Sequence, residues 1–379
     1  MINFSQVLWL LTQTGSRAAR VLLVLYALDL GAGPVAIGAL AASLAVLPML
    51  VSWPVGRLSD LYGARWLMMA GMLAGAAGMF IAWAWPVLPA LFIAGMLNGL
   101  LVGFFNVSLQ NLIGQLSTAE TRPRTFSNLS LMNSGASFIG PLLAGFAIDH
   151  AGYGATALYL ALLSVFPALL LLVWGGGMPK GVKGSARPAG GGLRAMLADR
   201  RVWRILFVCS MVQSGLDMFQ FYMPVYAHSI GLSASVIGVL VSTFAAAGFA
   251  VRLFLPRLVR RHGEGSVLAW AFYLSAASFL LVPFFENAAV IGVLSFLFGL
   301  GNGAGQPITM MLTFSQSTDG RSGETLGLRS TVIHFTRLVA PSVFGYIAVL
   351  ATLSVVFWAN AAMLAAGGAL SRGRRTSKQ

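Results

Sequence analysis

The chain has 379 residues, of which 58% are hydrophobic and only 9% are charged. Soluble globular domains carry about 25% charged residues, so this composition excludes an ordinary soluble protein and is typical of one that crosses a membrane many times. The formal net charge of +14 would also suit a nucleic-acid-binding protein, but the distribution of that charge, given below, excludes this class.

Apolar runs that are bounded by charged residues, Gly and Pro predict the membrane-crossing helices, each of which needs about 20 mostly apolar residues. The runs are 5–29, 35–56, 66–85, 87–113, 126–149, 155–174, 202–229, 234–256, 265–285, 288–315, 325–349 and 353–371. We therefore expect an all-α membrane protein with twelve transmembrane helices in two six-helix bundles. The first run follows an uncharged opening and continues as a full span, so we expect no cleavable signal peptide.

The positive charges predict which ends of these helices lie in the cytoplasm. Nineteen of the 24 Lys and Arg residues fall in the C-terminal tail and in the loops that follow even-numbered spans, and the opposite loops contain none. The positive-inside rule then places both termini in the cytoplasm. This asymmetry explains the net charge without nucleic acid. We expect a multi-pass protein of a bacterial inner membrane, with the lipid bilayer around it.

A Gly- and Pro-rich segment with scattered positive charge separates two similar halves. We expect an N-terminal half, a cytoplasmic linker, a C-terminal half and a basic tail at 1–174, 175–200, 201–371 and 372–379. A shift of 200 residues places Gln13 on Gln213 and Gly15 on Gly215, and a slip of four residues then pairs Asn98 with Asn302. Parallel repeats of this kind are typical of transporters with a substrate site between two pseudo-symmetric halves.

The segment GRLSDLYGAR between the second and third spans lies in an expected cytoplasmic loop and contains a recognisable pattern, G-x-L-a-D-r-x-G-r. Five residues occupy positions of this pattern: Gly56, Leu58, Asp60, Gly63 and Arg65. The segment resembles the signature loop of the major facilitator superfamily, although Leu61 stands where a basic residue is usual. Together with the topology and the repeat, the resemblance covers the whole chain.

The resemblance implies the twelve-helix fold of that superfamily and a monomer that works by rocker-switch alternating access. It also implies that four residues of the loop form a conformational latch at the cytoplasmic side: Gly56, Asp60, Gly63 and Arg65. A plain solvated turn is the alternative for this loop.

Polar side chains inside apolar helices indicate which helices face water, because unpaired polar groups are costly in hydrocarbon. The first, fourth, seventh and tenth spans carry them at helical spacing and therefore on one helix face, and the fifth and eleventh spans flank these four. In the superfamily that the chain resembles, the corresponding helices line the cavity. We predict that the substrate is bound by Gln13, Arg17, Arg20, Asn98, Gln213, Gln220, Asn302, Gln306 and Arg337.

The charges of this set are mostly positive. Arg17, Arg20 and Arg337 lie deep in their spans, and Asp217 is the one acid far from both ends of its span. Arg binds carboxylate or phosphate bidentately, so an anionic ligand fits. Alternatively, Arg17 or Arg20 pairs with Asp217 in a structural or gating ion pair. For proton coupling we predict Asp217 and, because His changes charge near neutral pH, His334. A plain hydrogen-bonding role is the alternative for His334.

We predict a secondary transporter that moves a small organic molecule by alternating access, exporting it in exchange for protons. The segment GASFIGPLLAG (135–145) partly resembles a motif of the superfamily's antiporters and drug exporters, although close helix packing also explains its small residues. Uptake or exchange of an organic anion is the alternative within transport, and a non-transporting receptor or structural protein is the alternative outside it.

The sequence does not show the motifs that are typical of enzymes, ATP-driven pumps or metal sites. No Ser-His-Asp arrangement, HExxH or GxxxxGK[ST] motif stands out, so we expect neither an enzyme nor an ATP-driven pump. Cys209 is the single cysteine, which leaves no internal disulfide and no Cys-based metal pattern. We expect no metal and no organic cofactor.

Overall fold

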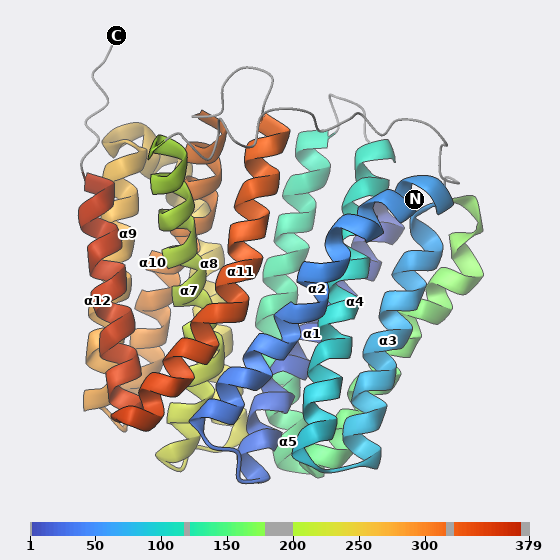
Figure 1. Cartoon of the computed structure of the whole chain (residues 1–379), viewed down its shortest axis with the longest axis horizontal. Helices are drawn as coiled ribbons and strands as arrows, with labels where there is room; N and C mark the ends of the chain where they lie inside the picture. The colour runs from blue at the N-terminus through green and yellow to red at the C-terminus, as the bar shows by residue number, and fades with distance from the viewer. Residues whose placement is uncertain (1, 117–121, 179–199, 316–321, 373–379) are drawn as a thin grey trace. The chain divides into compact units, whose positions relative to one another are not determined.

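The computed structural model describes residues 2–116, 122–178, 200–315 and 322–372, and the regular structure in them is helical (Figure 1). The first part contains α1 (Ile2–Asp29), α2 (Pro34–Tyr62), α3 (Ala64–Ala84), α4 (Leu88–Leu116) and α5 (Arg122–Trp174). The second contains α7 (Arg200–Ser229), α8 (Ala234–His262), α9 (Glu264–Leu281), α10 (Ala288–Ser315), α11 (Ser322–Leu350) and α12 (Leu353–Arg372). Short 3₁₀ turns follow α5 and α9, at Gly175–Gly177 and Val282–Phe284.

α5 combines two of the predicted spans. Gly152 interrupts it with φ 79° and ψ 172°, a backbone conformation that is open essentially only to Gly. The two arms on either side of this residue correspond to the predicted spans 126–149 and 155–174. The fold predicted from the sequence is thus confirmed over the described residues.

Nine helical segments of the described chain are long and apolar enough to cross a membrane, and the double helix of α5 counts as one of them. α1 and α7 are not among the nine. These two helices carry many of the polar side chains predicted to line the cavity, which lowers their apolar content. A helix that is shielded from lipid by its neighbours tolerates such side chains.

The segment 56–65 is not the loop that was expected. α2 continues to Tyr62, α3 begins at Ala64, and Gly63 alone connects them with φ 84° and ψ 159°. The expectation was wrong because the polar residues of this segment mark the end of the apolar run and not the end of the helix. A glycine can reverse the chain in one residue because it lacks a Cβ atom. Gly263 connects α8 to α9 in the same way, with φ 78°.

The chain divides into two compact units. Unit 1 comprises Met1–Arg187 with Ala227–Ser242, and unit 2 comprises Pro188–Tyr226 with Thr243–Gln379. Within unit 1, α1 packs against α5, and α4 packs against both α2 and α3. Within unit 2, α9 packs against α10 and α12. The expected ends of the two halves, the linker and the tail stay predictions.

The burial of side chains repeats along the chain with the 200-residue shift. Residues 91–100 of α4 and 291–300 of α10 show the same sequence of buried, half-buried and exposed positions, residue for residue. The four-residue slip that paired Asn98 with Asn302 is therefore wrong, and Asn98 corresponds to Phe298. The slip followed a shared pair of letters, whereas burial reports which side of each helix faces its neighbours.

Candidate functional site

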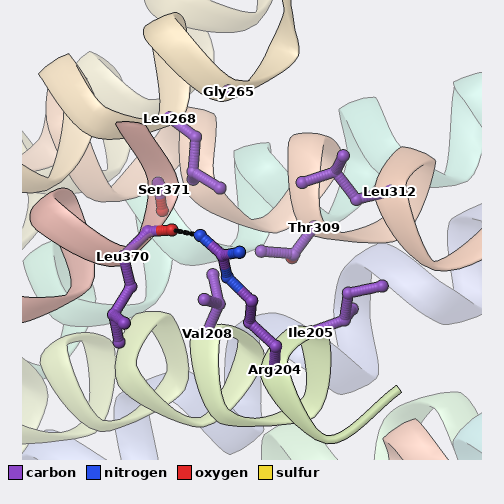
Figure 2. A pocket seen from close by; sticks show the side chains of 9 residues that line it. All are labelled: Arg204, Ile205, Val208, Gly265, Leu268, Thr309, Leu312, Leu370 and Ser371. Carbon is purple, nitrogen blue, oxygen red and sulfur yellow. Dashed lines mark hydrogen bonds between the residues drawn. The ribbon is translucent and has the colours of Figure 1, made fainter. Parts of the chain in front are cut away.

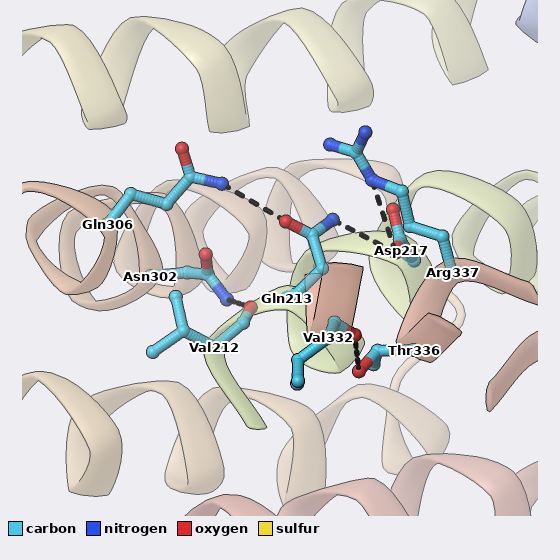
Figure 3. Close-up of polar contacts among 8 residues, drawn as sticks. All are labelled: Val212, Gln213, Asp217, Asn302, Gln306, Val332, Thr336 and Arg337. Atoms are coloured by element: carbon cyan, nitrogen blue, oxygen red, sulfur yellow. Dashed lines mark hydrogen bonds and ion pairs between the residues drawn. The ribbon is translucent and has the colours of Figure 1, made fainter. Parts of the chain in front are cut away.

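Three helices of unit 2 bring four of the predicted site residues into one chain of contacts (Figure 3). Gln213 and Asp217 lie one turn apart on α7, and Nε2 of Gln213 donates a hydrogen bond to Oδ2 of Asp217 at 2.9 Å. From α10, Nε2 of Gln306 donates to Oε1 of Gln213 at 3.3 Å. From α11, Nε of Arg337 lies 3.9 Å from Oδ2 of Asp217.

Asp217 is the buried end of this ion pair. Its side chain is 3% exposed, whereas that of Arg337 is 33% exposed. Taking an isolated carboxylate out of water is costly, and a buried charge is kept only where opposite charge and hydrogen bonds compensate for that cost. Arg337 supplies the charge and Gln213 supplies a charge-assisted hydrogen bond. Arg337 and Gln213 are thus two polar partners of the buried Asp217 carboxyl group.

A second contact fixes α10 against α7. Nδ2 of Asn302 donates to the backbone carbonyl oxygen of Val212 at 3.2 Å. Gly215 leaves room for this amide, because a Cβ atom at that position would lie 2.9 Å from Nδ2 of Asn302. Gln306 follows one turn later on α10, so the contact that anchors Asn302 also places Gln306 beside Gln213.

Unit 1 contains the repeat counterpart of the Gln213 contact. Nε2 of Gln13 on α1 donates to Oδ1 of Asn106 on α4 at 3.0 Å. Asn106 corresponds to Gln306 under the 200-residue shift. The predicted substrate-binding set took Asn98 from this helix and omitted Asn106. Asn98, which that set included, is buried on another part of α4.

The other predicted binding residues lie inside helices as expected. Arg17 and Arg20 are half-buried on α1, well away from its ends. α1 and α5 lie close together here, since a Cβ atom on Gly140 would lie 2.7 Å from Cβ of Arg17 and 2.9 Å from the backbone oxygen of Thr14. Gln220 is half-buried on α7, and His334 is half-buried on α11, three residues before Arg337. The roles of these side chains in binding or proton coupling stay predictions.

The backbone of two predicted latch residues, Gly56 and Asp60, belongs to the last turns of α2. A third, Gly63, makes the connection to α3. Nη2 of Arg65 donates to the carbonyl oxygen of Leu172 near the end of α5 at 2.8 Å. A cation at the last carbonyls of a helix is favourable. Arg65 thus ties α3 to α5 within unit 1, and the latch stays a prediction.

Sequence reasoning missed a capping contact in unit 1. Oδ1 of Asp149, near the middle of α5, accepts a hydrogen bond from the backbone N–H of Ala234 at 3.1 Å, and Oδ2 accepts from that of Ser235 at 2.8 Å. These are the first two residues of α8, so the carboxylate satisfies donors that a helix start leaves open. Oγ of Ser242 donates to the carbonyl oxygen of Phe138 at 2.7 Å further along the same pair of helices.

A crevice in unit 2 is lined by residues other than the predicted ones (Figure 2). It has an empty volume of about 440 Å³, including the space at its mouth, and is lined by Arg204, Ile205, Val208, Gly265, Leu268, Thr309, Leu312, Leu370 and Ser371. Arg204 reaches across it to donate to the backbone carbonyl of Leu370 in the last turn of α12. Among the described residues, no three His, Cys, Asp or Glu side chains gather in a way that suits a metal ion.

Comparison with known proteins identifies the family. The family profile described as Major Facilitator Superfamily matches residues 8–341 and, in a second match, residues 227–378. The chain therefore belongs to the major facilitator superfamily. It is a multi-pass membrane transporter for a small molecule, and not an enzyme.

Individual relatives are distant but cover most of the chain. An uncharacterized MFS-type transporter of Bacillus subtilis (strain 168), YuxJ, is 24% identical and covers 86% of this chain and 84% of its own length. Quinolone resistance protein NorA of Staphylococcus aureus (strain COL) is 22% identical, with 85% and 83% covered. The crystal structure of nucleoside transporter NupG is 16% identical, with a TM-score of 0.79 over 100% of this chain and 99% of that one.

Proposed function

We propose that this transporter exports a small organic compound in exchange for protons, and that Asp217 carries the proton. The observation that carries the proposal is the buried carboxyl group of Asp217, which contacts Gln213 and the half-exposed Arg337. An ionisable group inside a membrane protein is costly to keep, and such groups commonly mark ion and proton pathways. The resistance protein among the relatives supports export over uptake.

The charge of the substrate decides the direction of coupling at such a site. A cationic or hydrogen-bond-donating group binds Asp217 only while Asp217 is ionised. Such a group and a proton then exclude each other, as antiport requires. An anion that binds Arg337 gains when Asp217 is protonated, because Arg337 is then released from its ion pair. Anion and proton then bind together, as symport requires.

We therefore assign export to compounds that bear a cationic or hydrogen-bond-donating group, such as zwitterionic or amphipathic drugs. Arg17 and Arg20, which the sequence predicts to bind the substrate, suit an anionic group. The second candidate is symport or exchange of an organic anion, and it is favoured by the half-exposed guanidinium of Arg337. We further propose a monomer, as is expected for the family, in a bacterial inner membrane. The asymmetry of Lys and Arg supports placing both termini in the cytoplasm.

The proposal is tested in liposomes that contain the purified protein and an internal pH-sensitive dye, under an imposed pH gradient. Organic anions, sugars and cationic drugs are added in turn. We expect cationic or zwitterionic drugs to cause proton movement opposite to their own, and we expect Asp217→Asn to reduce this movement to that of protein-free liposomes. Asp29→Asn is the matched control, because Asp29 is an exposed acid at the end of α1.

Three outcomes would change the assignment. Proton movement in the same direction as an organic anion would favour the second candidate. Proton movement that survives in Asp217→Asn would remove Asp217 from the carrier role and leave His334 as the candidate. Transport of a compound without any proton movement would make the protein a facilitator or an exchanger.

A further inference from the structure

We propose that Gln213 and Gln306 form a relay in which the two side-chain amides turn over together and report the protonation state of Asp217 to α10. This inference rests on the proposed function, since it requires that Asp217 gains and loses a proton. It adds a role that proton carriage by Asp217 does not itself require, namely that a residue on another helix presents different chemistry to the substrate in the two states.

The charge of Asp217 dictates the orientation of both amides. An ionised carboxylate only accepts hydrogen bonds, so Gln213 has to present Nε2 to it. Oε1 of Gln213 then faces Gln306 and can only accept, so Gln306 has to present Nε2 in turn. The observed contacts, 2.9 Å to Asp217 and 3.3 Å between the glutamines, follow this order. Figure 3 shows the side-chain oxygen of Gln306 directed away from Gln213.

A proton on Oδ2, the oxygen that Gln213 contacts, reverses the order of these contacts. The hydroxyl group that forms there is buried and needs an acceptor, while Oδ1 remains an acceptor. Gln213 supplies one when its amide turns over and brings Oε1 to the acid. Nε2 of Gln213 then faces Gln306, which has to present Oε1. Gln213 is only 2% exposed, so neither end of its amide can turn to water instead, and an unsatisfied buried amide costs about 1–3 kcal/mol.

The surroundings of Asp217 allow this reversal. Arg337 of α11 faces Asp217 and always remains a donor, and His334 lies three residues before Arg337. Within α10, the sequence 288–315 contains no Asp, Glu, Lys, Arg or His. Asn302 on α10 donates to a backbone oxygen, which always accepts, whereas Gln306 donates to the side-chain amide of Gln213, which can present either end. The proton state of Asp217 is therefore read on α10 through Gln306.

The orientation of the Gln306 amide decides which hydrogen-bonding group a ligand meets. It is half-buried, so one end of its amide faces Gln213 and the other is open to a binding partner. With Asp217 ionised, the open end is the acceptor Oε1. With Asp217 protonated, it is the donor Nε2. A ligand that donates a hydrogen bond, such as an amine, thus binds in competition with the proton, which is the linkage that antiport requires.

The relay is testable without any substrate. The protein is reconstituted with ¹⁵N-labelled glutamine side chains, and the amide resonances of Gln213 and Gln306 are followed by solid-state NMR from acid to alkaline pH. Each resonance is assigned by its loss in a Gln→Leu variant. Protonation of Asp217 is followed in the same samples by its infrared carboxyl band, assigned with Asp217→Asn.

We expect both glutamine resonances to shift with the midpoint of Asp217. Gln213→Leu should abolish the shift of Gln306 while Asp217 still titrates, and this titration guards against a folding defect in that variant. Gln306→Leu should preserve the shift of Gln213, because Gln213 contacts Asp217 directly. Gln13→Leu removes the counterpart contact to Asn106 and should leave the shift of Gln306 in place.

A Gln306 shift that persists in Gln213→Leu, or that is missing in the wild type while Asp217 titrates, would overturn the relay. The proposed function fails on a different measurement, since it is overturned by proton-coupled transport that survives in Asp217→Asn.

Discussion

The polar layers of the two units share a scaffold but differ in charge. In each unit a glutamine on the first helix is hydrogen-bonded to the residue 93 positions further along the chain. Gln13 donates to its partner, whereas Gln213 accepts from its partner. One turn after each glutamine the layers diverge, since Arg17 stands in unit 1 where Asp217 stands in unit 2. A guanidinium stays charged at every accessible pH, whereas a carboxyl group has two states. The helix contacts thus recur in both units, whereas at this position it is unit 2 that has a carboxyl group, as the proposed proton carriage requires.

The largest effect that we expect from this difference comes from Arg17→Gln. The proposed function assigns Arg17 to an anionic group of the substrate, and a hydrogen bond to a charged group is worth about 1.5–3 kcal/mol. The apparent affinity for compounds with such a group should fall by about 10- to 150-fold. The number of protons moved per substrate should not change. Both quantities are measured in the liposome assay.

The matched variant for this test is Asp217→Asn, which should show the opposite result, a loss of proton movement. A loss of proton movement in Arg17→Gln at unchanged affinity would place Arg17 in the coupling machinery and remove the distinction between the units.

A smaller effect distinguishes two glycines at equivalent positions. A Cβ atom on Gly215 would lie 2.9 Å from Nδ2 of Asn302 and 3.1 Å from Leu364, whereas on Gly15 the closest atom, in Leu163, would be 3.7 Å away. We expect Gly215→Ala to destabilise the protein by about 1–3 kcal/mol through overpacking. Gly15→Ala should be neutral or stabilising by up to about 1 kcal/mol, because Ala favours a helix interior.

Thermal unfolding in nanodiscs with tryptophan fluorescence would measure this pair. An equal loss of stability in both variants would mean that Gly215 is packed no more tightly than Gly15 is in unit 1. A loss confined to Gly215→Ala would support the role of Asn302 in anchoring α10.

Much of the fold followed from the apolar runs, because a helix that crosses lipid needs a continuous apolar stretch and each run marks one. The segment 56–65 was read as a loop because composition reports the end of the apolar layer, while the helix continues past it to Tyr62. The predicted alignment of α4 with α10 was wrong for another reason. The letters Asn-Gly recur at 98 and 302, but only burial shows that Asn106 is the counterpart of Gln306.

The candidate site was predictable in its residue types but not in its pairings. Gln213, Asp217 and Gln306 stood out as polar residues in apolar helices. That Gln213 bridges the other two depends on how α7 and α10 are rotated, which no spacing within one helix reports. Arg337 was named as a binding residue, and its position beside Asp217 was not foreseen. The capping contact of Asp149 joins segments 85 residues apart and left no local signal.

The smallest effect concerns that cap, which also lacks a repeat counterpart. α8 begins with two N–H donors at Ala234 and Ser235, whereas α2 begins with Pro34, which has none, and Val349 stands 200 residues after Asp149. Removing a helix cap costs about 0.5–2 kcal/mol. Asp149→Ala should therefore speed hydrogen exchange in the first turn of α8 by about 2- to 30-fold.

Mass spectrometry of a peptide that covers residues 234–242 would measure this exchange. Asp149→Asn keeps one acceptor oxygen and should give an intermediate rate, because one of the two backbone donors stays bonded. Glu286→Ala removes an exposed acid between α9 and α10 and should leave the rate unchanged. Equal rates in Asp149→Ala and the wild type would show that water satisfies these donors as well as the carboxylate does. Exchange rates that rise from the wild type through Asp149→Asn to Asp149→Ala would instead show that Asp149 holds the start of α8 in unit 1. The 200-residue repeat has no equivalent of this contact.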